Sequence, residues 1–414
     1  MTGALDRIAD GRWLTAQRAR RLALVSFAVT TASLLSLLIT ASGTLDWMGR
    51  PIGTDFSNVY AAGRMALDGH AAAVWDWPQH YAAQQALHGR ADVPFYGWHY
   101  PPPFLMVAAL LALMPYLVAL VAWQGVTAAL ALAVVLRVAP GRWTLPIALG
   151  FPAVFVCLGH GQNGFLTAAL LGGAMLALDR HPNLAGVLIG LIAYKPQFGF
   201  LLPLLLIAGG QWRVAWVATL TVLTLYAVPI VVLGPDVWPA FATSIGLTRD
   251  VVIGEAQTGP AKMITPYAAI LLNGGSAGLA WSVQSTAIVL AAALVVMAAR
   301  APAPLRGAVV IPAVLIATPY AFDYDMVALG MAIAFLAEQA RRYGWRRYER
   351  SALALAYAAP LIGRQFAEVS GVPLNLIAIV AVLLIATRRL MTAGSVAPRL
   401  TASPYRHSRA GFAR

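Results

Sequence analysis

The feature that most constrains this chain is a set of apolar stretches long enough to cross a lipid bilayer. The first runs from Leu22 to Ala41 without a charged residue. A helix needs about 20 apolar residues to span the hydrocarbon core of a membrane. Over the whole chain, 60% of the residues are hydrophobic and only 11% are charged. The sequence therefore predicts an all-α integral membrane protein.

The apolar pattern predicts about ten to twelve transmembrane helices. The candidate ranges are 22–42, 103–136, 143–158, 164–179, 183–194, 197–210, 213–233, 278–299, 306–320, 325–340, 351–367 and 372–389. Twelve passes would place both termini on one side of the membrane. An alternative is that 183–210 forms one long helix kinked at Pro196, which would change the topology. Several candidates are shorter than a membrane is thick, which indicates a cavity or a thinned region.

The net charge of +13 has a topological explanation. Arginines gather beside the apolar stretches, and the positive-inside rule assigns such clusters to the cytoplasm. They are Arg18, Arg20, Arg21, Arg341, Arg342, Arg346, Arg347, Arg350, Arg388 and Arg389. We therefore expect an inner-membrane protein with cytoplasmic segments at 1–21 and 390–414, the latter disordered, around a transmembrane domain at 22–389. Nucleic acid is not an expected partner; anionic lipid binding is a second use for the arginines.

Two segments are too polar to span the membrane and are expected on the outer face. The first is residues 43–101, and the second is residues 234–277, with a half-helix from Ile264 to Leu272. The first loop is rich in aromatic residues and histidines, a composition typical of a membrane interface, and an aromatic belt is the interpretation favoured for most of them. These residues are Trp47, Tyr60, Trp75, Trp77, His80, Tyr81, His88, His99 and Tyr100.

Disulfides and cofactors find little support in the sequence. The single cysteine, Cys157, lies in an apolar segment, so a buried thiol is expected and an intrachain disulfide is excluded. The histidines and acids of the first loop lack a recognised metal-ligand spacing, and there is no nucleotide-binding fingerprint. We expect neither a metal nor another cofactor.

Asp55 is the most conspicuous polar residue near the first membrane helix. It lies in the segment 53–60, Gly-Thr-Asp-Phe-Ser-Asn-Val-Tyr, which leads into an amphipathic stretch. A carboxylate so close to lipid is costly unless it is hydrated, paired or used. Asp55 could simply cap the helix that follows, or it could belong to a functional site.

Further polar groups fall at the predicted outer ends of later helices. Lys195 interrupts an apolar helix pair and is one of only two lysines, so a phosphate is a candidate ligand. Asp323 and Asp325 follow Thr318-Pro319-Tyr320, where one acid is explained by helix capping and two favour a site. The remaining candidates are His160, Gln162 and Asn163 in a glycine-flanked turn, and Tyr100 before Pro101, Pro102 and Pro103.

These motifs, taken in order, resemble glycosyltransferase family 87. The resemblance rests on Gly53-Thr54-Asp55-Phe56, Tyr60, Arg64, Gly69, Tyr100-Pro101-Pro102, Gly161-Gln162-Asn163, Lys195-Pro196, Thr318-Pro319-Tyr320 and Asp325, and covers roughly residues 50–340. It implies the GT-C architecture: a bundle of transmembrane helices with a large first extracytoplasmic loop that carries a catalytic acid.

The resemblance also implies an activity. A sugar would move from a polyprenyl-phosphate donor to a glycolipid or glycan acceptor with inversion, and Asp55 would be the general base. Lys195 and Arg64 would bind the donor phosphate. The substrate pocket would contain Tyr60, His99, Tyr100, His160, Gln162, Asn163, Tyr320, Asp323 and Asp325. Mannose is the default sugar, with another hexose or a pentose as alternatives because no histidine follows in residues 318–325.

Two other functions fit a multi-pass membrane protein. A transporter or lipid flippase would use intramembrane charges as a translocation path, but the two halves of this sequence show no internal repeat. In a noncatalytic scaffold, Asp55, Lys195 and Asp325 would only cap helices or reach toward water. The polar first loop and the short helices favour the enzyme.

Overall fold

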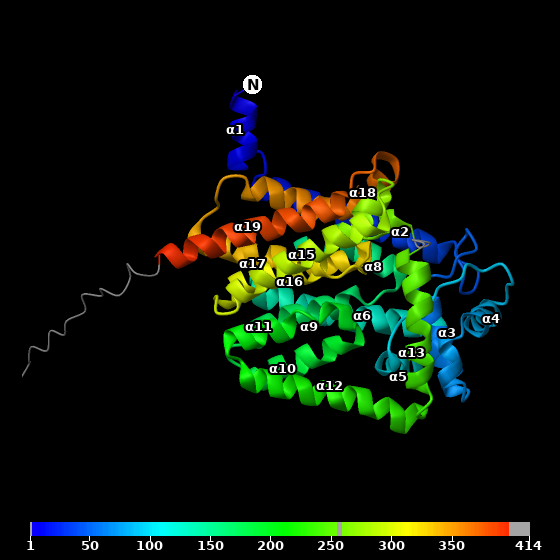
Figure 1. Ribbon diagram of the computed structural model, residues 1–414. Helices are drawn as coiled ribbons and strands as arrows, with labels where there is room; N and C mark the ends of the chain where they lie inside the picture. Colours follow the sequence, from blue (N-terminus) through cyan, green and yellow to red (C-terminus); the bar gives the residue numbers. More distant parts are fainter. Residues whose placement is uncertain (1, 255–258, 397–414) are drawn as a thin grey trace, which may run out of the picture.

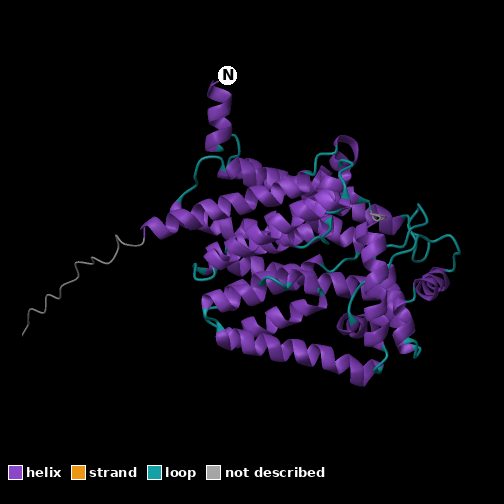
Figure 2. Cartoon of the chain, in the orientation of Figure 1, coloured by secondary structure: helices purple, strands orange, loops and turns teal. Residues whose placement is uncertain are grey.

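The computed structural model describes residues 2–254 and 259–396, and these fold into a helical bundle without a sheet (Figures 1 and 2). Five described helices are long and apolar enough to cross a membrane. They are α2 (Ala16–Ile39), α6 (Tyr116–Val138), α12 (Trp212–Leu233), α15 (Ala277–Ala298) and α19 (Leu374–Val396). The expected all-α membrane class is confirmed.

Nine other helices complete the part of the bundle that the structure describes. They are α5 (Pro102–Leu111), α7 (Thr144–Leu149), α8 (Pro152–His160), α9 (Gly164–Ala177), α10 (Pro182–Leu191), α11 (Leu202–Gly209), α16 (Ala303–Ala317), α17 (Val327–Tyr343) and α18 (Glu349–Ser370). Helix α16 is the centre of the packing, because it is buried along most of its length and contacts α9, α15, α17 and α19. Helices α2 and α12 bury little of their apolar surface, so their side chains are left to face lipid.

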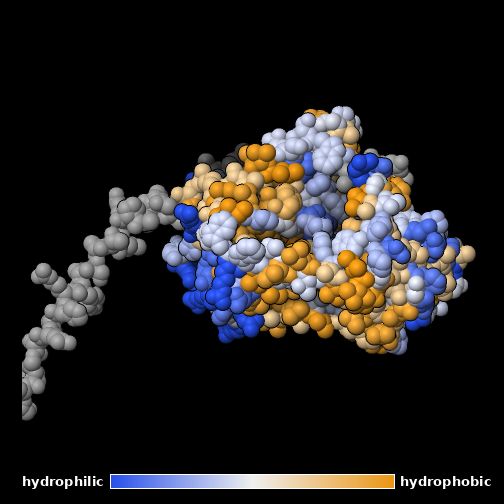
Figure 3. Space-filling view, turned by 60° about the horizontal axis from the view of Figure 1, so that its bottom comes forward, coloured by the Kyte–Doolittle hydropathy of each residue, from blue (hydrophilic) through white to orange (hydrophobic). Residues whose placement is uncertain are grey.

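Polar elements gather at one end of the bundle. Figure 1 shows α3 (Phe56–Leu67), α4 (Trp77–His88) and α13 (Val237–Thr248) at this end. Three short turns and a short helix accompany them: η1 (Ala71–Trp75), the π-helical turn η4 (Arg249–Gly254), η5 (Pro260–Lys262) and the helix α14 (Pro266–Leu272). Figure 3 shows an apolar belt between two hydrophilic ends, as a membrane-embedded bundle requires.

The opposite end holds both described termini and several of the arginines. Helix α1 (Thr2–Asp10) contacts α18, and Arg347 pairs with Asp6 at 3.1 Å. Arg346 donates to Thr392 Oγ1 at 2.6 Å, and the buried Arg389 pairs with Glu349. Arg346, Arg347 and Arg389, three of the arginines expected on one side of the membrane, thus lie in the region where α1, α18 and α19 meet, far from α3 (Figure 1).

Some predicted helices have different limits. The range 103–136 is divided into α5 and α6 because Pro115 lacks an N–H and restricts the residue before it. The range 143–158 is divided at Gly150, where a Cβ would lie 2.2 Å from the carbonyl oxygen of Ala23 in α2. Helix α19 continues to Val396, beyond the predicted start of the tail; the disorder predicted for residues 397–414 lies outside the described residues.

The segment 183–210 is not one kinked helix. Two 3₁₀ turns, η2 (Ile192–Tyr194) and η3 (Pro196–Phe198), separate α10 from α11 and leave Lys195 between them. The two-helix prediction is therefore confirmed. The interruption brings the backbone of Lys195 out of helical geometry inside an otherwise apolar part of the bundle.

The first outer loop has a packed interior, which corrects the prediction of an aromatic belt for most of its residues. Trp75, Tyr60, Tyr100 and His80 are buried, whereas Trp47 is largely exposed. Trp75 Nε1 donates to the Tyr100 carbonyl oxygen at 3.0 Å. The aromatic side chains therefore hold the loop together and only a minority face outward.

Candidate active site

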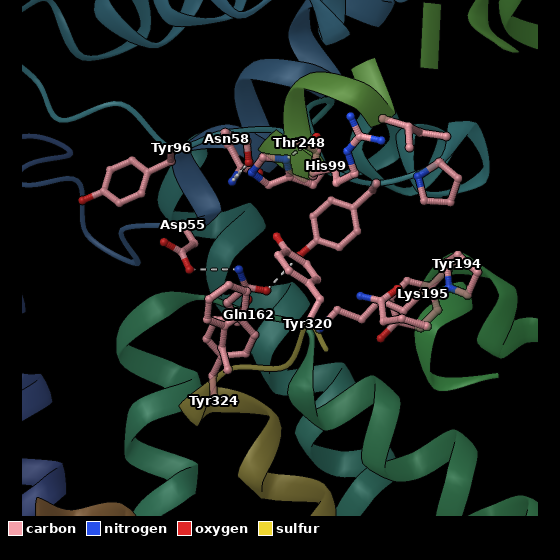
Figure 4. Close-up of a pocket in the computed structure, with 18 of the residues that line it drawn as sticks. Asp55, Asn58, Tyr96, His99, Gln162, Tyr194, Lys195, Thr248, Tyr320 and Tyr324 are labelled. Atoms are coloured by element: carbon pink, nitrogen blue, oxygen red, sulfur yellow. Dashed lines mark hydrogen bonds between the residues drawn. The ribbon is translucent and has the colours of Figure 1, made fainter. Parts of the chain in front are cut away.

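A cavity of about 470 Å³ lies where the polar end meets the bundle. Its lining comes from widely separated parts of the chain, between Asp55 and Arg364. The polar lining residues are Asp55, Asn58, Tyr96, His99, Tyr100, Gln162, Tyr194, Lys195, Gln197, Thr248, Arg249, Lys262, Tyr320, Tyr324 and Arg364. Figure 4 shows several of these side chains surrounding one space.

Asp55 projects its carboxylate into this cavity. It directly precedes α3 but makes no side-chain capping bond, so helix capping does not explain it. The turn before it depends on Gly53, whose φ of 77° suits glycine and whose added Cβ would lie 2.9 Å from Leu120. Gln162 Nε2 donates to Asp55 Oδ2 at 2.9 Å (Figure 4). The carboxylate is therefore oriented by a neighbouring amide.

A hydrogen-bond network fixes the direction of that amide. Tyr100 donates its hydroxyl proton to Gln162 Oε1 at 3.0 Å, and Asn163 Nδ2 donates to the same hydroxyl at 2.8 Å. Gln124 Nε2 holds the Gln162 backbone carbonyl oxygen at 3.0 Å. Since Oε1 of Gln162 accepts from Tyr100, its NH₂ group must face Asp55.

Lys195 enters the cavity wall as half of a buried ion pair. Its Nζ lies 2.8 Å from Asp325 Oδ1, and the two side chains are 4% and 1% exposed. The other carboxylate oxygen of Asp325 accepts from the Phe322 N–H at 3.1 Å. The charge of Lys195 is thus compensated by an acid that does not line the cavity.

Lys262 is the cation nearest to Asp55 among the described side chains. Its Nζ lies 3.6 Å from Asp55 Oδ2. The same nitrogen lies 5.7 Å from the ring centre of Phe322 and 5.6 Å from that of Tyr324. On another side, His160 Nδ1 is 3.8 Å from Asp55 Oδ2 and 2.8 Å from Thr54 Oγ1. A lysine and a histidine thus approach the same carboxylate oxygen.

These neighbours decide the protonation of Asp55. Burial raises the pKa of its carboxyl, but the charge of Lys262, followed by His160 and the Gln162 hydrogen bond, lowers it further than burial raises it. The resulting pKa lies below the usual value, so the group is a carboxylate at neutral pH. For His99, burial outweighs attraction to Asp55 and lowers the pKa to about 4, which leaves the ring neutral.

Comparison with known families gives this cavity a chemical context. The sequence model of glycosyltransferase family 87 matches residues 98–319, more than half of the 414 residues. The chain belongs to glycosyltransferase family 87. No curated protein and no solved structure matches it. Membership makes this chain a membrane glycosyltransferase.

The family 87 match is narrower than the resemblance of roughly 50–340 found in the motifs. It includes Tyr100, Gln162, Lys195 and Lys262, whereas Asp55 and the segment from Tyr320 onward lie outside it. The structure nevertheless brings both parts to one cavity. The predicted residues that line it are Asp55, His99, Tyr100, Gln162, Lys195 and Tyr320.

Several other predicted residues of this family 87 chain lie behind the lining. Asn163 and Asp325 support Tyr100 and Lys195, and His160 contacts Asp55 from the side. The buried Asp323 accepts from the Tyr324 N–H at 2.9 Å. Among the described residues, no group of three or more His, Cys, Asp or Glu side chains is placed to hold a metal ion.

Arg64 and Tyr60 need correction, because neither lines the cavity. Arg64 follows Asp55 by nine positions, which is about 180° around a helix at 100° per residue, so it projects from the opposite side of α3. There it is half-exposed and pairs with Asp68 at 3.4 Å. Tyr60 is buried and donates to the Met114 carbonyl oxygen at 2.7 Å. Its role is to join α3 to the α5–α6 connection.

Several cavity residues of this glycosyltransferase were not predicted from the sequence. Lys262 could have been found, because it is the second of only two lysines and lies in the second predicted outer loop. Tyr96, Thr248 and Arg249 also line the cavity. They lie in irregular segments or at a helix end, where no periodicity indicates the direction of a side chain.

Asp323 offers a test of the charge balance beneath the cavity. Burial raises the pKa of its carboxyl to about 6, although Lys262 and Arg364 oppose the rise. Folding therefore favours the protonated acid, and stability is lost as pH rises from the unfolded pKa, about 4, through 6. Asp323→Asn should raise the free energy of unfolding at pH 7.5 by roughly 2–3 kcal/mol, and by less at pH 5.

Thermal unfolding of the purified protein in detergent at both pH values would measure this difference. The amide oxygen of asparagine can still accept from the Tyr324 N–H, so the backbone turn is preserved. An equal shift of the unfolding temperature at pH 5 and pH 7.5 would show that Asp323 does not titrate in this range.

Proposed function

We propose that this family 87 chain transfers a sugar, mannose or another hexose, from a polyprenyl-phosphate donor to a lipid or glycan acceptor. The observation that carries the proposal is the Asp55 carboxylate, which is ionised, oriented by Gln162 and directed into a cavity large enough for a sugar. Membership of a membrane glycosyltransferase family supplies the reaction type. The arrangement also agrees with a GT-C enzyme.

The proposed reaction is a single displacement with Asp55 as general base. The carboxylate takes the proton of an acceptor hydroxyl while that oxygen forms a bond to the anomeric carbon. The bond between this carbon and the phosphate oxygen breaks, and polyprenyl phosphate leaves with the electron pair. A β-linked donor would give an α-linked product. The lipid-linked sugar is a co-substrate, so the proposed step requires no resident cofactor.

Side chains around Asp55 have separate tasks in this proposal. Lys195 is proposed to contact the donor phosphate, with Asp325 keeping its ammonium in place. Tyr100, Gln162 and His99 are proposed to surround the sugar. Arg64 is left out of the phosphate site because it pairs with Asp68 on the other side of α3.

We infer that the cavity opens on the extracytoplasmic face of the cell membrane and that both termini are cytoplasmic. The support is the position of the arginine-rich region at the far end of the bundle from α3 (Figure 1). Lysine and arginine are enriched in cytoplasmic segments of membrane proteins. The donor and acceptor would then meet on the outer side.

Membranes from cells with and without the protein provide the direct test. They would be incubated with a radiolabelled polyprenyl-phosphate mannose, and the lipid and glycan fractions would be separated for new labelled products. The proposal expects label to appear only with the protein, and glycolipid profiles of the two cell lines would identify the acceptor. Uptake of a solute into vesicles without transfer of any sugar would favour a transporter instead.

A further inference from the structure

The cations of the cavity differ in how completely their charges are neutralised. Lys195 contacts Asp325, Arg249 contacts Asp250 at 2.8 Å, and Arg364 contacts Glu368 at 3.3 Å. None of these three acids lines the cavity. The acid beside Lys262 is Asp55 itself, at 3.6 Å, a separation longer than a direct hydrogen bond. The positive charge of Lys262 is therefore compensated by the carboxylate of the proposed base.

The backbone of Lys262 is anchored although its side chain is not tightly bonded. Its turn, η5, is followed by Met263, which forms a bridge with Phe322, and the Ile264 N–H donates to the Ala321 carbonyl oxygen at 3.0 Å. The ammonium lies beside the rings of Phe322 and Tyr324, and the side chain is 15% exposed. A small movement of this flexible side chain suffices to change its anionic partner.

One helix start beside the cavity, that of α5, offers few backbone donors for an anion. Helix α5 begins beside the cavity with three consecutive prolines, Pro101, Pro102 and Pro103. Proline has no backbone N–H, so the free donors that often bind phosphate at helix starts are largely missing here. At this part of the cavity a phosphate must therefore be held by side chains, and the cationic ones in the lining are Lys195, Lys262, Arg249 and Arg364.

From these observations we propose that Lys262 binds the donor phosphate and is drawn away from Asp55 when the donor enters. This inference rests on the proposed function. The phosphodiester of the donor carries one negative charge, and the departing phosphomonoester gains a second. Attraction to Lys262 therefore increases as the anomeric bond breaks, which stabilises the transition state more than the bound donor.

Sharing one ammonium also links donor binding to the base. Without donor, Lys262 compensates the buried Asp55 carboxylate. Once the ammonium moves to the phosphate, Asp55 loses part of that compensation and holds a proton more readily. The base is thereby activated only in the presence of a donor, which favours an order of binding in which the donor precedes the acceptor.

Binding of farnesyl phosphate to the purified full-length protein in detergent tests the proposal, with farnesol as the uncharged probe. Lys262→Met should weaken farnesyl phosphate binding about 10- to 100-fold, as expected for the loss of a charged hydrogen bond, and leave farnesol binding unchanged. Lys262→Arg should retain most of the affinity. Arg64→Gln is the matched control, because it removes a cation that lies off the cavity.

The competition with Asp55 has its own measurement. Asp55→Asn should tighten farnesyl phosphate binding because Lys262 no longer compensates a carboxylate, and the gain should shrink when Lys262 is already methionine. Unchanged farnesol binding and an unchanged elution profile in size-exclusion chromatography show that each variant is folded. If Lys262→Met misfolds, Lys262→Gln takes its place in the same comparison.

Equal affinity of the wild type and the folded Lys262 variant for farnesyl phosphate would overturn the assignment. So would an equal loss in Arg64→Gln, which would indicate a general effect of charge. If the wild type still transfers sugar from a polyprenyl-phosphate donor in either case, the proposed function stands and only the role of Lys262 fails. If the wild type neither transfers sugar nor binds farnesyl phosphate more tightly than farnesol, the proposed function and the role of Lys262 are both contradicted.

Discussion

Replacing Asp55 with asparagine is expected to reduce sugar transfer at least 100-fold without unfolding the protein. A positioned general base contributes about 10²- to 10⁴-fold to a rate, and an amide cannot accept the acceptor's proton. Asparagine has nearly the same shape, and its carbonyl oxygen can still accept from Gln162 Nε2, which lies 2.9 Å from Asp55 in the native site. The initial rate of label transfer from polyprenyl-phosphate mannose in membranes measures the effect.

Asp68→Asn is the matched control for this prediction. Asp68 is another acid of the first outer loop, but its exposed carboxylate pairs with Arg64 and does not line the cavity. Its replacement should leave the transfer rate near that of the wild type. Full activity of folded Asp55→Asn would contradict the assignment of Asp55 as the base and would direct the search to another group in the cavity.

Replacing Lys195 with methionine should destabilise the protein by about 3–5 kcal/mol. The substitution leaves the Asp325 carboxylate, which is 1% exposed, without its partner at 2.8 Å, and removal of one member of a buried ion pair typically costs this much. Thermal unfolding in detergent would show a clear fall in unfolding temperature. An unfolding temperature equal to that of the wild type would mean that Asp325 has another source of compensation.

A second substitution separates the structural task of Lys195 from a role in binding. In Lys195→Met/Asp325→Asn no buried charge is left uncompensated, and the asparagine oxygen can still accept from the Phe322 N–H. Most of the lost stability should return. If Lys195 also contacts the donor phosphate, this folded variant should have an increased KM for the donor.

The grouping of the central site residues could be predicted from the sequence because successive membrane-spanning helices alternate in direction. Asp55, Gln162 and Lys195 each lie at or next to the end of a helix, so alternation of passes was enough to place them on one side. Their hydrogen bonds could not be derived in this way. The amide of Gln162 is directed by Tyr100, which is 62 positions away in sequence.

Other features escaped prediction for identifiable physical reasons. Arg64 was assigned to the phosphate site through the family resemblance, but the turn of α3 carries it to the opposite side. Lys262 lies in an irregular segment whose path is set by the bridge between Met263 and Phe322. The outer-loop aromatics resembled an interfacial belt in composition, yet contacts such as Trp75 with the Tyr100 carbonyl turn them inward.

The distribution of the cavity lining along the chain has a consequence for biosynthesis. Asp55 follows the first long apolar helix, whereas Arg364 belongs to α18, near the end of the described chain. During insertion into the membrane, the carboxylate therefore leaves the translocation machinery long before Lys262, Tyr324 and Arg364 are made. A nascent chain carries its proposed base without the walls that would enclose a sugar. Chemical competence is thus reached only after α18 has been made and has joined the bundle.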